Sequence, residues 1–461
     1  MKIKLENLGP IRQAELSLSD FTILSGLNNT GKTYITYAIY GFLKLWRKVI
    51  NIDTSNEDIQ QLLTSGSIQI DLLSYVSKAQ KYVDSGCKVY SKLLPIEVFG
   101  SSEKVFGKTD FRAILEDKEI DISNSYHGVI RAVNVSLFSL DKQENDNYLT
   151  VTLLVPKESQ KLTKENIQNV ISNAIKNILF ASVFPTVFIA SAERTGSAIF
   201  RKELNFARNR LLEEMAKSGS NVDPRKLLFS SYQDYALPVQ DNVEFVRNIE
   251  GIAKSDSFLA QEFPDILDYY SEIIGGKYII SRNDELLFEP ISGKIKLTMD
   301  ESSSAVRSLL DVSFYLKHLA KKGDLLMVDE PELNLHPENQ RKVARLLAAL
   351  VNFGIKVFIT THSDYILKEL NTLIMLGQGS ERIQKIAETE GYNDFEILNV
   401  GKICAYSTKK SLLKVGDNKR KTKCLTLVKS EITQELGIEA ESFDESIDEM
   451  NRIQEEIIWG G

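Results

Sequence analysis

Apolar and polar side chains alternate in two runs near the start of the chain, residues 2–8 and 11–18, which Gly9-Pro10 separates. A period of two is typical of β-strands, so these runs predict a β-hairpin. Residues 21–25 follow as a β-branched and apolar run, which indicates a buried strand. The next apolar run, residues 34–46, is long enough for a helix.

The middle of the chain changes its pattern several times. We expect helical pieces at 59–63 and 70–83, a hairpin over 133–155 with its turn near 141–147, an amphipathic helix over 164–180 and a short buried strand at 186–190. Residues 198–274 are rich in Glu, Lys, Arg and Leu and predict mostly helix, with interruptions at Pro224, Pro238 and Pro264. Alternating strands return over 277–299, with turns at 283–284 and 292–293.

Composition narrows the class of protein. With 461 residues, 43% hydrophobic and 26% charged, the chain is an ordinary globular sequence that is too long for one simple core. A net charge of −7 excludes binding of polyanions by bulk charge. Cys87, Cys404 and Cys424 form neither a disulfide framework nor a zinc pair, which suits a reducing cytosol. Since no secretion signal is present and the longest apolar stretch, 178–192, contains Pro185, we expect a cytoplasmic protein with no membrane contact.

The stretch GLNNTGKT, residues 26–33, matches the phosphate-binding pattern Gly-x-x-x-x-Gly-Lys-Ser/Thr at every position. A strand before it and a helix after it would surround an anion with backbone N–H groups at the positive end of the helix dipole. Lys32 would reach the β- and γ-phosphates, and the Thr33 hydroxyl would ligate Mg²⁺. The alternative is a glycine turn that matches by chance. We expect ATP to contact Asn28, Asn29, Thr30, Gly31, Lys32 and Thr33.

Two carboxylates follow a second apolar run. Residues 325–328 predict a strand buried on both faces, and Asp329 and Glu330 stand at its end. In phosphate-loop ATPases this is where the metal and the attacking water lie, so Asp329 would hold Mg²⁺ and Glu330 would act as general base. An exposed acidic turn is the alternative. A third buried strand, 357–361, leads to His362, which we expect near the γ-phosphate as a sensor rather than as a surface residue.

Together these three stretches resemble the ABC-type ATPases of the SMC, Rad50 and RecF superfamily. The string DEPELNLHP at 329–337 and THS at 361–363 are specific to that group, and the resemblance is strong over 1–45 and 300–375. Within the group the chain is similar to bacterial ATPases related to the overcoming-lysogenization-defect nucleases, and to ATPase subunits of anti-phage systems such as PARIS and Septu. The weaker string SAER at 191–194 resembles the group's P-A-E-R.

The resembling ATPases carry a Ser- and Gly-rich signature at a helix start, which contacts the γ-phosphate of ATP in the partner subunit. The corresponding stretch here is ESSSAVRS at 301–308, before an apolar helix over 309–319, and we expect Ser303 and Ser304 to bind nucleotide there. Ala305 stands where related sequences have Gly, which limits the approach of the backbone to a phosphate. Slow hydrolysis or a loosened dimer follows as an expectation, and a serine helix cap is the alternative.

The last segment of the chain differs from that of the overcoming-lysogenization-defect nucleases. Residues 376–461 hold no Asp-x-Asp pair on a buried strand, whereas those nucleases carry a metal-dependent domain there. They instead predict a basic hairpin over 406–428, with Lys409, Lys410, Lys414 and a cluster at 419–423, and then an acidic amphipathic helix over 442–458. The basic hairpin is either a solvated face or a contact surface for DNA or for a partner.

The motifs divide the chain into five expected segments. These are an N-terminal ATPase lobe with the phosphate loop at 1–50, a mixed α/β insertion completing that lobe at 51–190, a helical or coiled-coil insertion with a β-hairpin at 191–299, a C-terminal ATPase lobe at 300–375, and the basic hairpin with the acidic helix at 376–461. The expected fold class is therefore α/β, an ABC-type P-loop ATPase head with a helical insertion between two lobes.

The resemblance implies an ATP hydrolase that closes as a dimeric sandwich and uses its nucleotide state to gate a separately encoded effector, a toxin or nuclease, in anti-phage defence. The alternative is a DNA-repair or recombination ATPase of the RecF type that binds DNA through the hairpin. The motor subunit of a membrane transporter fits poorly, because the long insertion and the early strand pair differ from that compact cassette.

Overall fold

The computed structural model describes residues 1–101, 103–116, 119–132, 135–155, 163–199, 235–281, 285–293, 295–414, 421–439 and 441–459. They form two compact units that interleave along the chain. The first unit comprises Met1–Lys4, Phe42–Leu93 and Asp110–Pro185, and the second comprises Leu5–Gly41, Leu94–Thr109 and Thr186–Gly461. Among the described residues, no helix combines the length and the apolar character needed to cross a membrane.

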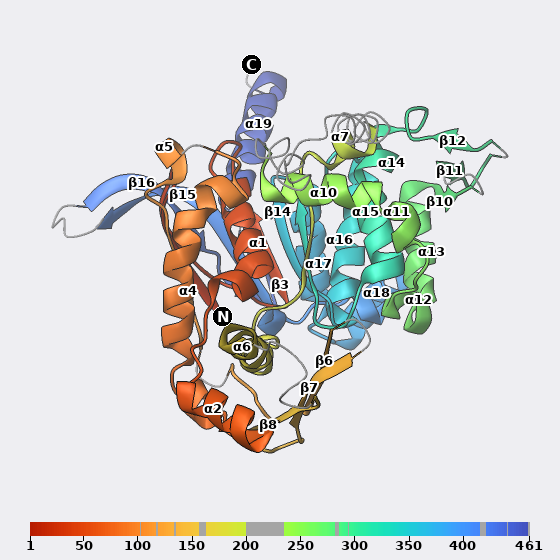
Figure 1. Cartoon of the computed structure of the whole chain (residues 1–461). Helices are drawn as coiled ribbons and strands as arrows, with labels where there is room; N and C mark the ends of the chain where they lie inside the picture. The colour runs from red at the N-terminus through yellow and green to blue at the C-terminus, as the bar shows by residue number, and fades with distance from the viewer. Residues whose placement is uncertain are drawn as a thin grey trace, which may run out of the picture. The chain divides into compact units, whose positions relative to one another are not determined.

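A large mixed sheet organises the second unit (Figure 1). Its strands follow the spatial order β1 (Lys2–Leu8), β2 (Ile11–Ser17), β16 (Lys421–Lys429), β15 (Ile403–Lys414), β3 (Phe21–Ser25), β14 (Lys356–Thr361), β13 (Leu325–Asp329) and β9 (Val187–Ala190). The strands from β15 to β9 are parallel, whereas β15 and β16 form an antiparallel hairpin. The carboxyl ends of β3, β13 and β14 therefore meet at one edge of the sheet.

The central strands are buried on both faces. Every residue of β3 and of β13 is buried, and so are all residues of β14 after Lys356. Continuous apolar runs of this kind are typical of parallel strands that helices cover on both sides. The predicted strands at 21–25, 325–328 and 357–361 and the α/β fold class are thus confirmed.

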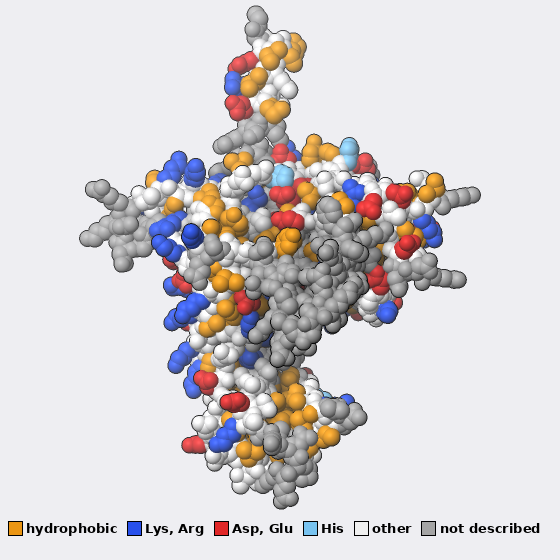
Figure 2. Space-filling model, turned by 45° about the horizontal axis from the view of Figure 1, so that its top comes forward, with side chains coloured by type: hydrophobic (Ala, Val, Ile, Leu, Met, Phe, Trp, Pro, Cys, Tyr) orange, Lys and Arg blue, Asp and Glu red, His pale blue; other side chains and the backbone are white. Residues whose placement is uncertain are grey.

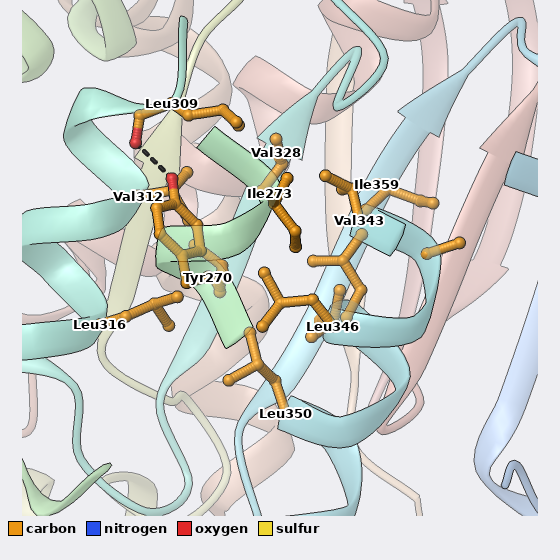
Figure 3. Close-up of a cluster of buried hydrophobic side chains, with 14 of the residues drawn as sticks. Tyr270, Ile273, Leu309, Val312, Leu316, Val328, Val343, Leu346, Leu350 and Ile359 are labelled. Atoms are coloured by element: carbon orange, nitrogen blue, oxygen red, sulfur yellow. Dashed lines mark hydrogen bonds between the residues drawn. The ribbon is translucent and has the colours of Figure 1, made fainter. Parts of the chain in front are cut away.

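Helices α13 (Pro264–Ile274) and α16 (Pro337–Asn352) supply much of the core beside this sheet. Figure 3 shows Tyr270 and Ile273 of α13 facing Val343 and Leu346 of α16, with Val328 of β13 at the same cluster. The Tyr270 hydroxyl is buried there and donates to the Leu309 carbonyl. The cluster consequently packs two helices against β13, the strand that carries Asp329.

The second unit holds further helices and strands. They are η1 (Leu94–Val98), α5 (Glu103–Phe106), α7 (Arg194–Ile199), α10 (Leu237–Arg247), α11 (Ile249–Ile252), α12 (Phe258–Glu262), β10 (Gly276–Ile280), β11 (Leu286–Pro290), β12 (Leu297–Thr298), α14 (Ser304–Ser308), α15 (Leu310–Phe314), η2 (Tyr315–Leu319), α17 (Asp364–Leu376), α18 (Glu381–Thr389), η3 (Asp394–Glu396), η4 (Val400–Lys402), β17 (Ile432–Thr433), β18 (Gly437–Ile438) and α19 (Glu441–Trp459). The predicted helical character of 198–274 is confirmed over 235–274, whereas 200–234 lie outside the described residues. The strands over 277–299 are confirmed. The longest helices within 235–274 have 11 residues, so this described part forms no coiled coil.

The first unit combines helices with an antiparallel sheet. The helices are the second half of α1 (Lys32–Val49), α2 (Asn56–Ser65), α3 (Leu73–Val76), α4 (Ala79–Leu93) and α6 (Lys164–Phe180), and the sheet has the order β4 (Ser67–Asp71), β8 (Tyr148–Leu153), β7 (Val135–Lys142), β6 (Tyr126–Ala132). Strand β5 (Asp110–Ile114) lies beside β1. The rings of Phe42, Tyr90 and Phe111 contact one another in the core of this unit, with Tyr90 in edge-to-face contact with both phenylalanines.

Two expectations for the first unit need correction. The predicted helix at 70–83 is wrong at its start, because Ser67–Asp71 is strand β4, with alternating burial, and helix α4 begins only at Ala79. Pairing of β4 with β8 determines the conformation of this segment. A local sequence pattern does not reveal that pairing, because the two strands are far apart along the chain. Strand β6 was not predicted. The predicted helices over 59–63 and 164–180 and the hairpin of β7 with β8 are confirmed.

Two of the predicted helix breaks are helix beginnings. Pro238 lies in the first turn of α10 and Pro264 opens α13, where a proline costs no hydrogen bond. Pro224, the turn at 283–284 and the centre of the basic hairpin lie outside the described residues. The final predicted helix is present as α19, and Figure 2 shows hydrophobic and acidic side chains next to each other on it.

Candidate active site

The phosphate-loop motif connects β3 to α1, which begins at Lys32. Gly26 and Gly31 have φ angles of 139° and 88°, in a region that side chains disfavour. Space is also limited, because a Cβ at Gly26 would lie 2.1 Å from Thr408 Oγ1 and one at Gly31 would lie 2.9 Å from Ile11 Cγ1. Both glycines of the motif are therefore required by conformation and by packing.

Lys32 lies folded over its own loop. Its Nζ donates to the carbonyl oxygens of Gly26 and Leu27, at 2.7 and 2.9 Å. Burial lowers the pKa of Lys32, and the carboxylates of Glu330 and Asp329 act in the opposite direction. An ammonium group so placed, with acidic groups close by, is suited to carry charge to an incoming phosphate.

Asp329 ends β13 in a fully buried position. Burial raises its pKa to about 6, whereas hydrogen bonds from the hydroxyls of Thr360 and Thr33 lower it. Its Oδ2 is buried and has no hydrogen-bond partner among the described residues. Mg²⁺ prefers carboxylate and hydroxyl oxygens, so Thr33 and the unpaired Oδ2 of Asp329 fit this ion as ligands.

Glu330 follows in an unusual backbone conformation. Its φ angle of 52° is left-handed, which costs a residue with a side chain on the order of 1 kcal/mol or more. The Glu330 N–H donates to the Thr360 hydroxyl at 3.1 Å and to the Thr360 carbonyl at 3.2 Å. In this conformation the Glu330 side chain is 26% exposed and lines the same cavity as the phosphate loop.

His362 lies between two carboxylates. Its Nδ1 is 3.4 Å from Glu330 Oε1 and 3.3 Å from Glu332 Oε1. Glu332 is buried and also accepts the His362 N–H at 2.8 Å and the Thr361 hydroxyl at 2.9 Å. Burial raises the pKa of Glu332. Glu332 thus ties the loop that carries His362 to the end of β13.

A cavity of about 550 Å³ brings most of the predicted residues together. The cavity is lined by the end of the phosphate loop and the start of α1, residues 28–34, and by Pro10, Glu330 and His362. Within the described chain, Ser303 and Ser304 do not line it. Ser303 is instead the N-cap of α14, a helix of five residues, and its hydroxyl accepts from Val306 N at 3.3 Å.

Several residues at the site were not singled out from the sequence. Thr360 contacts Asp329 and Glu330, Glu332 contacts His362, and Thr408 contacts the phosphate loop. Arg194 is a further case, since the string SAER was noted but its arginine was given no role. Thr360, Glu332 and Arg194 lie in or next to the motifs, whereas Thr408 lies in none, and their contacts join segments that are far apart along the chain.

Comparison with known protein families identifies one family whose model matches the chain. The family model described as the AAA ATPase domain matches residues 1–367, which include the phosphate loop, Asp329, Glu330 and His362. No curated protein matches the chain. Among solved structures, the SMC head domain from Thermotoga maritima is 11% identical with a TM-score of 0.32, and covers 94% of this chain and 98% of its own.

A second solved structure is the Smc head domain with an extended coiled coil, bound to the C-terminal domain of ScpA, derived from Pyrococcus furiosus. It is 13% identical with a TM-score of 0.31, and 98% of each chain is covered. At such low TM-scores, neither structure carries a conclusion about this chain.

Proposed function

The chain belongs to the family of the AAA ATPase domain, and we propose that it hydrolyses ATP in the cavity between Gly26–Thr33 and the ends of β13 and β14. The observation that carries the proposal is the shared cavity. It brings a phosphate-binding loop within reach of Glu330 and His362, from two other strands of the same sheet edge. ATP hydrolysis requires these groups around one nucleotide.

Each residue has a distinct role in the proposed reaction. The loop N–H groups and Lys32 bind the phosphates, and Thr33 and Asp329 hold Mg²⁺, which would neutralise charge on the β- and γ-phosphates. Glu330 accepts a proton from the attacking water as that water bonds to the γ-phosphorus. The bond from this phosphorus to the bridging oxygen breaks, and ADP leaves. His362, next to Glu330, senses whether the γ-phosphate is present.

A dimeric sandwich is the form in which we propose that hydrolysis occurs. Ser303 and Ser304 lie outside the cavity of their own subunit, as residues that contact the nucleotide of a second copy must. The ABC-type resemblance supports this arrangement, and the Ala305 departure supports slow turnover. From the same resemblance we propose a cytoplasmic ATPase that gates a separate effector, a toxin or nuclease, in anti-phage defence.

A second candidate, a DNA-binding ATPase, is favoured by the hairpin of β15 and β16, which runs out beyond the sheet (Figure 1). Lys410 faces Leu425 and Lys423 faces Leu412 across this hairpin. Residues directly opposite share a face, and so do residues two apart on a strand, so Lys410, Lys421 and Lys423 belong to one face. All three are exposed, and such a row suits a phosphate backbone.

Phosphate release tests the proposed function. The purified chain should hydrolyse ATP with Mg²⁺, and Asp329→Asn should abolish hydrolysis. A matched control is Asp324→Asn, at the other end of the same strand, where the carboxylate accepts from Lys321 N at 3.0 Å. The control should change stability but keep turnover. Equal hydrolysis by Asp329→Asn and the wild-type chain would contradict the proposal.

DNA binding separates the two candidates. A DNA-binding ATPase should lose affinity steeply as salt rises, and Lys410→Glu with Lys423→Glu should reduce that affinity. Lys385→Glu, an exposed lysine on α18, is the control. Salt-dependent binding that the hairpin variants abolish would favour the second candidate, and its absence would favour the gated effector.

A further inference from the structure

Arg194 is a fully buried charged side chain near the site. It is 1% exposed and donates four hydrogen bonds, all to backbone carbonyls. Nε donates to Ser308 O at 2.6 Å, and Nη1 donates to Ser191 O at 2.8 Å. Nη1 also donates to Asp329 O at 2.6 Å, and Nη2 donates to Glu330 O at 2.8 Å.

The four acceptors belong to three separate segments. Ser191 follows β9, Asp329 and Glu330 end β13, and Ser308 is the last residue of α14. The same helix is attached to the β13 loop a second time, because the Ser308 hydroxyl donates to Leu333 O at 3.1 Å. One guanidinium therefore joins the helix that begins at Ser304 to the loop that carries the general base.

The contacts with Asp329 and Glu330 fix the backbone on both sides of Glu330. The Asp329 carbonyl belongs to the peptide that precedes Glu330, and the Glu330 carbonyl belongs to the peptide that follows it. Since Glu330 has a left-handed φ of 52°, its conformation depends on such external restraints. Thr360 restrains the N–H of Glu330, and Arg194 restrains both neighbouring carbonyls.

An arginine suits this position better than a lysine. Its planar fork presents five N–H groups in fixed directions, whereas a lysine ammonium is a compact charge with three rotatable donors. A buried guanidinium loses its water shell, and this burial lowers the pKa of Arg194, while Asp311 and Asp329 act in the opposite direction. A lysine at 194 would keep the charge but could not reach three segments at once.

We propose that Arg194 is a positioning residue that sets the orientation of Glu330 and passes displacements of the segment 303–308 to it. The proposal rests on the proposed function, because Glu330 is taken as the general base. A nucleotide of a second copy that contacts Ser303 would move α14. That movement would reach Glu330 through Ser308 and Arg194, so that turnover depends on closure of the dimer.

A double-mutant cycle tests the proposal. Arg194→Lys should lower kcat by about tenfold to a hundredfold, the range expected when a catalytic group is misplaced by about an ångström, and should leave the Kd for ATP within about threefold. In a Glu330→Gln background the same change should lower the residual kcat no further. A merely structural role would reduce kcat in both backgrounds alike, and that result would overturn the proposal.

Arg345→Lys is the matched control. Arg345 forms an equally directed fork, to Glu396 at 2.7 and 3.1 Å, away from Glu330. It should lower thermal stability without lowering kcat. If Arg194→Lys does not fold, Ser308→Ala removes the second attachment of α14, to Leu333 O, and should lower kcat by a few-fold at unchanged Kd. Unchanged kcat in that variant would overturn the part of the proposal that couples the segment 303–308 to Glu330.

The same measurements distinguish failure of the proposed ATP hydrolysis from failure of the Arg194 proposal alone. Failure of the proposed function would appear as a wild-type chain without hydrolysis, or as Glu330→Gln with full activity. Failure of the Arg194 proposal alone would leave Glu330→Gln inactive as expected while Arg194→Lys retained full kcat.

Discussion

The hydroxyls of Thr30 and Thr408 lie 2.6 Å apart although they are separated by 378 positions in the chain. Thr30 belongs to the phosphate loop, and Thr408 lies on β15, which runs parallel to β3. The Thr408 side chain also occupies the space beside Gly26. The loop is therefore shaped by the C-terminal hairpin as well as by its own sequence.

Thr408→Val should weaken ATP binding by about fivefold. The change keeps the volume of the side chain but removes the hydroxyl, which lies 2.6 Å from Thr30 Oγ1 and 3.4 Å from Ser25 O. A hydrogen bond of this kind contributes about 1 kcal/mol. Equilibrium binding of ATP measures the effect. Thr426→Val is the control on the neighbouring strand, because its hydroxyl donates to Gln13 O at 2.7 Å and has no contact with the loop. Equal losses in both variants would show a general loosening of the hairpin.

Lys32→Ala should abolish ATP binding and leave the fold largely intact. Among the described residues, the ammonium donates to two carbonyls of its own loop, those of Gly26 and Leu27, so its removal opens no core. Binding of ATP and thermal unfolding should be measured together. Lys176→Ala is the control, since Lys176 is also buried and donates to Arg47 O at 2.9 Å in the first unit. Wild-type affinity in Lys32→Ala would disprove the assignment of the loop.

Glu330→Gln should bind ATP normally, hydrolyse it about 10²–10⁴-fold more slowly, and accumulate as a closed dimer. The amide has almost the same shape as the carboxylate but cannot accept the proton of the attacking water. Measurement of mass in solution, with and without ATP, reports the dimer.

Adding Ser303→Arg to Glu330→Gln should undo the ATP-dependent dimer. Bulk and charge at the start of α14 would obstruct the surface that we expect to meet a second copy, while each subunit still binds its own ATP at 26–33. The mass of the double variant with ATP is the measurement. A double variant that dimerises as well as Glu330→Gln would mean that Ser303 serves only as the cap of its helix.

Asp311→Asn should change how stability depends on pH. Burial raises the pKa of Asp311 from 3.8 to about 7, although Arg194 lowers it. Between these values the folded chain holds a proton that the unfolded chain has released, so the free energy of unfolding falls as pH rises. Each pKa unit corresponds to about 1.4 kcal/mol. Urea unfolding near pH 5 and near pH 8 should therefore show a larger loss for the wild-type chain than for Asp311→Asn, and parallel losses would contradict the assignment.

The parts of the fold that local patterns specify were predictable. The apolar run of β3, the glycines of the phosphate loop and the helix after it lie within 30 residues, and their pattern indicates strand, turn and helix directly. The end of β4, Ile70–Asp71, was mistaken for the start of a helix, because pairing with β8, about 80 residues later, determines its conformation. Strand propensity is weak without such a partner.

The candidate site also contains residues that local sequence patterns predict and residues that they do not. Asp329, Glu330 and His362 stand next to buried strands, so their approach to the loop followed from parallel strand ends. The roles of Arg194 and Thr408 depend on hydrogen bonds between segments more than 100 positions apart, as in the Arg194–Ser308 contact. No periodicity along the chain encodes such a contact.

The sheet order has a consequence for synthesis of the chain. The strands β15 and β16 are made after residue 402, yet they stand between β2 and β3, which are made within the first 25 residues. Until the hairpin emerges from the ribosome, β3 has an open edge, which can pair wrongly or attract chaperones. Because Thr408 completes the phosphate loop, a nascent or truncated chain that ends before Ile403 should not acquire the nucleotide site. ATP use thus begins only after the strands β15 and β16 have been translated.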